Sequence, residues 1–126
     1  MKLIFCILLI TLTGCVTPSR WNTETKVTEA AYQTLNVVDT LQTMRVARHP
    51  DQWGESTSTW VIGEHPSQSK VVAWGLIKAA GHSFVTNELV TENVPQPIIR
   101  AWQWITLLDI TYAVNGNYRI GLGFGF

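Results

Sequence analysis

The stretch that decides the fold is TETKVTEAAYQTLNVVDTLQTMRVAR, residues 23–48. Its apolar side chains recur at intervals of three and four residues, which is the spacing of an amphipathic α-helix. These side chains are Val27, Ala31, Leu35, Val38, Leu41 and Met44. Arg45 and Arg48 suit the negative end of the helix dipole, and Pro50 cannot continue a helix. The sequence therefore predicts a helix over residues 23–48.

A loop and a second helix are expected next. Residues 50–66 carry prolines and glycines among serines and threonines, a composition typical of a loop. A helix is predicted over residues 67–90, with either Pro66 at its first turn or Ser67 as its N-terminal cap. The apolar residues of this segment wrap nearly all the way round the helix, which is the pattern of a buried or membrane-contacting helix.

A third helix is predicted over residues 97–114. It begins at a proline, and Asn115-Gly116 favours a helix stop through left-handed backbone geometry. Arg100 and Asp109 are its only charged residues, yet it falls short of the ~20 apolar residues that a membrane span requires. We expect an interfacial or protein-buried helix.

The C-terminal residues 118–126 alternate between apolar residues and residues that are glycine or arginine. The apolar positions are Tyr118, Ile120, Leu122, Phe124 and Phe126. Strict alternation is typical of extended chain. The predicted fold is therefore mainly α, with three helices (about 23–48, 67–90 and 97–114) and an extended C-terminal tail that packs on the helices or dips into a bilayer.

The N-terminus carries a signal for export. Lys2 precedes a short apolar run that ends in Leu12-Thr13-Gly14-Cys15. One charge, about ten apolar residues and small residues at a cleavage zone are typical of a secretory signal and too short for a membrane span. The segment resembles a bacterial lipoprotein signal peptide with its lipobox. The alternatives are an ordinary signal peptide and an uncleaved helix with a chance cysteine.

The lipoprotein resemblance implies cleavage before Cys15, which would then carry a diacylglycerol and an amide-linked acyl chain. Two or more acyl chains anchor a protein stably. Val16, where an Asp would retain a lipoprotein in the inner membrane, favours the periplasmic face of the outer membrane. We therefore expect a signal peptide (1–14), a lipidated tether (15–22) and a single helical membrane-associated domain (23–126).

Composition excludes several classes of protein. Without residues 1–14 the chain has 112 residues, which is enough for one domain. Acylation of Cys15 and loss of Cys6 would leave no thiol for a disulfide or a thiolate metal site.

The net charge of the whole chain is zero, with no basic run, so nucleic-acid binding is disfavoured. No HExxH motif, close histidine pair or phosphate-binding loop occurs, so no metal and no cofactor is expected.

Six tryptophans are many for a chain in which only 14% of residues are charged. Tryptophan suits sites that are apolar on one side and wet on the other, such as the membrane interface. Trp21, Trp102 and Trp104 are predicted to lie at that interface. The alternative is that the tryptophans fill the core of a small domain.

Three ionisable residues in apolar surroundings are candidates for chemistry. Burying such groups costs free energy unless they are paired. His82 on the second helix could pair with Asp39 on the first or Asp109 on the third, as general base and orienting carboxylate. The same pairing could equally be structural, because no nucleophile or substrate pocket is evident.

Several short motifs together resemble those of small, mostly uncharacterised membrane proteins from phage and bacterial genomes. The motifs are Asp39-Thr-Leu-Gln42-Thr43, Glu55, Gly63-Glu-His-Pro66-Ser67, His82 and Asn115-Gly-Asn-Tyr118. This resemblance implies a small helical membrane-associated protein and transfers no activity.

These features lead us to expect a lipid-anchored accessory protein of the cell envelope. In one form of this hypothesis the protein is encoded by a phage or prophage. It would have a binding or structural role, with the lipid bilayer and an envelope membrane protein as partners. One alternative is a small membrane-associated hydrolase that uses a His–Asp pair. A second is a lysis protein that links the inner and outer membranes.

Overall fold

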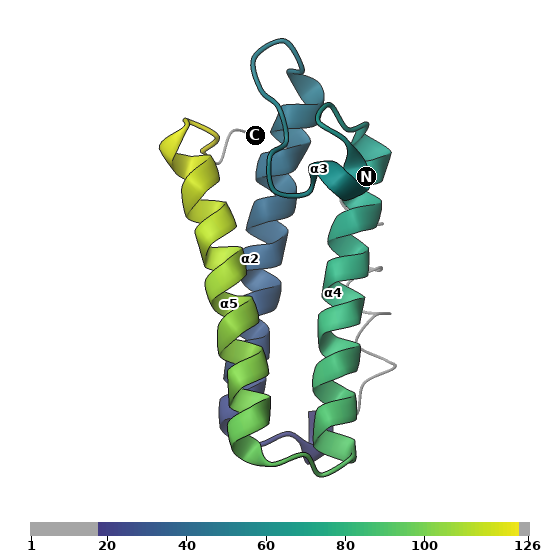
Figure 1. The fold of residues 1–126 in the computed structure, drawn as a ribbon, viewed down its shortest axis with the longest axis vertical. Coiled ribbons are helices and arrows are strands. Elements are labelled where there is room, and N and C mark those ends of the chain that lie inside the picture. The colour runs from purple at the N-terminus through teal and green to yellow at the C-terminus, as the bar shows by residue number, and fades with distance from the viewer. Residues whose placement is uncertain (1–17, 124–126) are drawn as a thin grey trace.

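Three long helices form the body of the molecule, and α2 packs against both α4 and α5 (Figure 1). The computed structural model describes residues 18–123. The elements of this part are η2 (Pro18–Arg20), α2 (Thr23–Arg48), α3 (Thr59–Ile62), α4 (Gln68–Thr91) and α5 (Gln96–Arg119). The prediction of a mainly α fold with three principal helices is confirmed.

Local sequence sets where α2 and α4 begin. The side chain of Asn22 accepts a hydrogen bond from the Thr25 backbone N–H at 2.8 Å. Ser67 does the same for the N–H of Lys70 at 3.4 Å, as its predicted capping role requires. These side chains satisfy donors that the first turn of a helix leaves without a partner.

The third helix is longer than predicted. In the structure, α5 continues through Asn115-Gly116 and ends at Arg119, and Gly116 does not adopt a positive φ. The chain turns instead at Gly121, where φ is +89°. The N–H of Leu122 then bonds to the carbonyl of Asn117 at 3.0 Å, which closes the end of the helix.

A tertiary contact explains this extension. The side-chain amide of Asn117 donates to Asp39 and Gln42 of α2, each at 3.3 Å, and so holds the last turns of α5 against α2. Tyr118, expected in an extended tail, is therefore helical. Leu122 is buried, and the final alternating residues 124–126 lie outside the described part of the chain.

The polar face of α2 points inward, whereas its apolar stripe is only partly buried. An amphipathic helix in a globular protein ordinarily buries its apolar stripe. Here Val27 is 63% exposed and Leu41 is also exposed. The buried side chains of α2 are mainly polar or charged: Thr25, Thr28, Glu29, Asn36, Asp39, Thr40, Gln42 and Thr43, together with Tyr32, Met44 and Val46. The three helices therefore meet through polar groups over much of their length.

An apolar cluster closes one end of the bundle. Met44 of α2, Ile62 of α3 and Val71 of α4 are buried together there, with Trp74 packed against them. The connection over residues 49–67 covers this end.

Glu55 organises that connection from within. Its carboxylate accepts bonds from the Thr57 N–H at 2.9 Å, the Thr57 hydroxyl at 2.7 Å and the Ser58 N–H at 2.9 Å. Burial raises the pKa of Glu55, but hydrogen bonds from Thr57, Ser58 and Thr43 outweigh it and hold the pKa below its ordinary value. Glu55 is thus a structural carboxylate of the loop.

Large apolar side chains lie on the outside of the bundle, most densely on α5. Those of α5 are Ile98, Trp104, Ile105, Leu108, Tyr112 and Tyr118. Ile77 and Phe84 of α4 are exposed as well. Within residues 18–123, no helix has both the length and the apolar character needed to cross a membrane.

Gly75 lets α4 approach α2 closely. A Cβ built on Gly75 would clash with the side chain of Thr40, whose Cγ2 would lie only 2.9 Å away. The amide of Asn36 donates to the Gly75 carbonyl at 2.9 Å across the same contact. The absence of a side chain at this position allows that hydrogen bond to form.

Replacing Gly75 by Ala is expected to destabilise the fold by about 1–3 kcal/mol, because the two helices must separate to relieve the overlap. Gly81→Ala on the same helix is the matched control, since its Cβ would meet nothing within 4 Å. That substitution should be neutral or stabilise by up to about 1 kcal/mol. Urea unfolding followed by circular dichroism measures the free energy of unfolding of both variants. Equal changes in the two variants would contradict a close contact at Gly75.

Candidate functional site

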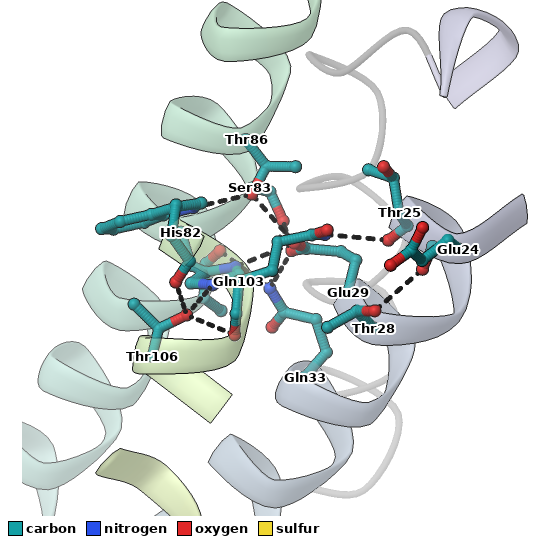
Figure 2. A network of polar contacts seen from close by, with 12 residues as sticks. Glu24, Thr25, Thr28, Glu29, Gln33, His82, Ser83, Thr86, Gln103 and Thr106 are labelled. Carbon is teal, nitrogen blue, oxygen red and sulfur yellow. Dashed lines mark hydrogen bonds and ion pairs between the residues drawn. The ribbon is translucent and has the colours of Figure 1, made fainter. Parts of the chain in front are cut away.

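His82 of α4 lies inside the bundle, between groups from the other two long helices (Figure 2). Its Nδ1 is 2.8 Å from Oε2 of Glu29 on α2, and its Nε2 is 2.7 Å from the hydroxyl of Thr106 on α5. The residue is only 4% exposed. One imidazole ring therefore joins all three helices of the bundle.

Glu29 gathers further donors around its carboxylate. The Ser83 hydroxyl donates to Oε1 at 2.6 Å, the Gln33 amide donates to the same oxygen at 2.8 Å, and the Thr86 hydroxyl donates to Oε2 at 3.2 Å. Burial raises the pKa of Glu29, but His82, Ser83 and Gln33 together outweigh burial, and the net pKa is lowered. The carboxylate is therefore held in its ionised form.

The ring of His82 is enclosed by aromatic side chains. The ring of Tyr32 stacks on it at 3.6 Å between centroids, and Trp102 stacks at 5.2 Å. Burial, with the charge of Glu29 nearby, raises the pKa of Tyr32 to about 12, so the phenol stays neutral. The indole N–H of Trp102 donates to Thr86 at 3.1 Å, which fixes that ring in turn. The imidazole ring of His82 is therefore held in place by two aromatic rings inside the bundle.

The hydrogen-bond partners place a proton on Nδ1 of His82 and allow two states at Nε2. An ionised carboxylate only accepts, so Nδ1 of His82 carries a hydrogen toward Glu29. Thr106 can donate to the backbone carbonyl of Trp102, 2.9 Å away, and accept from Nε2, which makes His82 an imidazolium. Thr106 can instead donate to Nε2, which leaves the ring neutral. The same heavy-atom geometry serves both protonation states.

A second polar cluster lies further along the bundle, toward the end that carries the loop. Lys78 of α4 contacts Asp39 of α2 at 2.5 Å, and Asn117 of α5 donates to the other oxygen of Asp39. Burial raises the pKa of Asp39 more than the charge of Lys78 lowers it, so the pKa lies above its ordinary value. A cavity of about 10 Å³ beside this pair has room for about one water molecule.

The structure does not bring His82 to either predicted aspartate. Asp39 is engaged by Lys78, and Asp109 lies on the exposed surface of α5. Sequence reasoning missed Glu29, the carboxylate that does reach the histidine. The sequence does contain a pattern that points to Glu29. Glu29, Tyr32, Asn36 and Asp39 recur at helical spacing and so define one polar face of α2.

Thr106, His82 and Glu29 form a hydroxyl–imidazole–carboxylate chain within proton-transfer distance. Their polar atoms are bonded within the protein, and Thr106 also lies within bonding distance of backbone carbonyls of its own helix. Glu29 and His82 are both buried. As packed, the cluster joins α2, α4 and α5, with the imidazole and the carboxylate buried and Thr106 half-buried.

The three tryptophans predicted at a membrane interface lie in different environments. Trp21 is 6% exposed and packs within the protein, and Trp102 is half-buried against His82. These two fit the alternative of a core role, because their rings fill space between elements. Trp104 is 52% exposed on the outer side of α5. The predicted lipidation site, Cys15, lies outside the described residues.

Replacing Glu29 by Gln should lower the free energy of unfolding at pH 7 by about 2–3 kcal/mol, because charge-assisted hydrogen bonds are lost. The folded pKa of Glu29 is lowered, so its contribution is present above the unfolded value of about 4.5 and is lost as pH falls through the folded value. The difference from wild type should therefore shrink in acid. Thermal unfolding at pH 7 and pH 3 measures it.

Glu24→Gln is the matched control for this experiment. Glu24 lies on the same helix and pairs with Arg100 at 2.7 Å, but both side chains are well exposed. Exposed pairs contribute under about 1 kcal/mol. A loss as large for Glu24→Gln as for Glu29→Gln would contradict the special position of the buried cluster.

Replacing Lys78 by Met should cost about 3–5 kcal/mol at pH 7, because an ionised Asp39 is left buried without a cation. The folded pKa of Asp39 is already raised, so lowering the pH protonates it and removes the penalty. Denaturant unfolding of the variant should accordingly show recovery in acid. Lys70→Met, at an exposed position of α4, is the control, and a deficit independent of pH would refute the role of Asp39.

Comparison with known proteins adds no further identification. No family model matches the chain, and neither a curated protein nor a solved structure matches it. The site is therefore interpreted from its geometry and chemistry.

Proposed function

We propose that this protein is a lipid-anchored accessory protein of the bacterial envelope, with a binding or structural role at the membrane. The observation that carries the proposal is the large number of apolar side chains exposed on the outside of the bundle, while many polar groups are buried inside it. Large apolar surfaces on a protein mark sites of contact with membranes or other proteins. An outer-membrane location and a phage or prophage origin belong to the same proposal.

The buried clusters support a structural role for the ionisable residues. Glu29 with His82, and Asp39 with Lys78, bond across helices that are far apart in the sequence. A polar contact of this kind is satisfied in one helix register only. The clusters then fix how the helices pair, while the outer surface is left free for binding.

The position of the tether supports anchoring close to the bilayer. Cys15 precedes Pro18 by three residues, which span at most about 11 Å of extended chain. Pro18–Arg20 contacts α4, and α2 begins directly afterwards. An acylated Cys15 would therefore hold this end of the bundle beside the membrane, within reach of an envelope membrane protein.

Replacing Cys15 by Ser tests the anchor. The variant should incorporate no labelled fatty acid and should leave the membrane fraction, because one thiol would carry the diacylglycerol. Cys6→Ser is the matched control and should keep both acylation and membrane association. Intact mass spectrometry with metabolic labelling measures the modification. Labelled fatty acid on Cys15→Ser would refute the proposal.

A further inference from the structure

The outward side of α5 carries a continuous row of apolar side chains. They recur at intervals of three and four residues, so they share one side of the helix. We name as the α5 outer face the residues Ile98, Ala101, Trp104, Ile105, Leu108 and Tyr112, all of which are exposed. From Ile98 to Tyr112 the row is about 21 Å long.

The other helices present a weaker surface of this kind. The exposed side of α4 holds Ile77 and Phe84, separated by Gly81. That of α2 holds Val27 and Leu41, with more than three helical turns between them. The α5 outer face is therefore the densest apolar surface among the described residues.

Charged groups border this face and do not interrupt it. Arg100 is turned to one side, where it forms an ion pair with Glu24 of α2. Asp109 lies at the other border, and Arg119 follows beyond Tyr112 near the end of the helix. Exposed tryptophan and tyrosine among aliphatic side chains are suited to the boundary between lipid headgroups and acyl chains.

Pro18–Arg20 and the beginning of α5 lie at the same end of the bundle. Figure 1 shows Pro18–Arg20 at the same end as the loop between α4 and α5. The first turn of α2 is bonded to α5 there, since the Gln103 amide donates to the Thr25 carbonyl at 3.0 Å. The three residues from Cys15 to Pro18 thus end close to where the α5 outer face begins.

We propose that the α5 outer face is the surface that contacts lipid, with α5 lying along the bilayer and its apolar row in the headgroup–acyl boundary. This inference rests on the proposed lipid anchor, which delivers the neighbouring end of the bundle to the membrane. The acyl chains hold the protein at the bilayer, and the α5 outer face sets its orientation. The polar clusters then stay between the helices, away from lipid.

Fluorescence quenching tests the contact. The acylated protein is reconstituted in vesicles of phosphatidylethanolamine and phosphatidylglycerol that contain brominated acyl chains, which quench tryptophan on contact. Trp104 should contribute most of the quenched signal, so Trp104→Phe should reduce the quenched fraction at least about twofold. Trp60→Phe is the matched control, because Trp60 is highly exposed on α3 and away from the face. Equal effects of the two variants would overturn the proposal.

Thiol labelling gives an independent measurement. Once Cys6 is removed and Cys15 is acylated, a single introduced cysteine is the only free thiol. Ile105→Cys and Ile77→Cys compare residues that are 66% and 60% exposed on different helices. On vesicles, a charged maleimide should label position 105 at least about tenfold more slowly than position 77. Similar rates at both positions would overturn the proposal.

The two readouts distinguish lipid contact from self-association of the protein. Protection of Ile105→Cys without quenching of Trp104 would indicate a second copy of the chain on this face and would overturn the lipid assignment. Intact mass reports acylation separately. Quenching of Trp104 in a protein that carries no acyl chain would uphold the lipid face while refuting the anchor.

Discussion

The contact of His82 with Glu29 is the interaction on which the arrangement of the helices depends. It lies inside the bundle, and it joins α2 to α4 directly and to α5 through Thr106. A buried carboxylate without such partners would cost several kcal/mol. Here donors from two helices surround it, so the charge is compatible with burial only when those helices are correctly placed. The observed pairing of α2, α4 and α5 is thus the one that supplies these partners.

That interior has a direct consequence for the surface. The polar side of α2 lies inside the bundle and occupies space that apolar side chains would otherwise fill. Many apolar side chains therefore remain outside, on α5 above all. In water such a surface is unfavourable by about 25 cal/mol for each Å² of apolar area. A membrane or an apolar partner would relieve this cost, which gives a physical reason for the lipid anchor and the apolar face to occur in one molecule.

Most of the secondary structure could be predicted because it depends on neighbours in the sequence. Apolar spacing, the Ser67 cap and Pro50 act within a few residues, and α2 and α4 follow them closely. The end of α5 did not follow its local signal. Asn115-Gly116 favours a stop, but bonds from Asn117 to α2 hold the helix together for another turn. A residue 75 positions away cannot be inferred from local pattern.

The sequence by itself determined which segments are helical, where α2 and α4 begin, and that His82 and Asp39 would need partners if buried. Tertiary structure alone decided the identity of those partners and the side of α2 that faces inward. The physical reason is that an amphipathic pattern distinguishes an apolar face of a helix from a polar face. It does not specify which residues of the other helices each face contacts. In this protein Glu29, His82 and Thr106 meet across three helices. The polar side of α2 that carries Glu29 is buried, whereas Val27 and Leu41 of its apolar stripe are exposed.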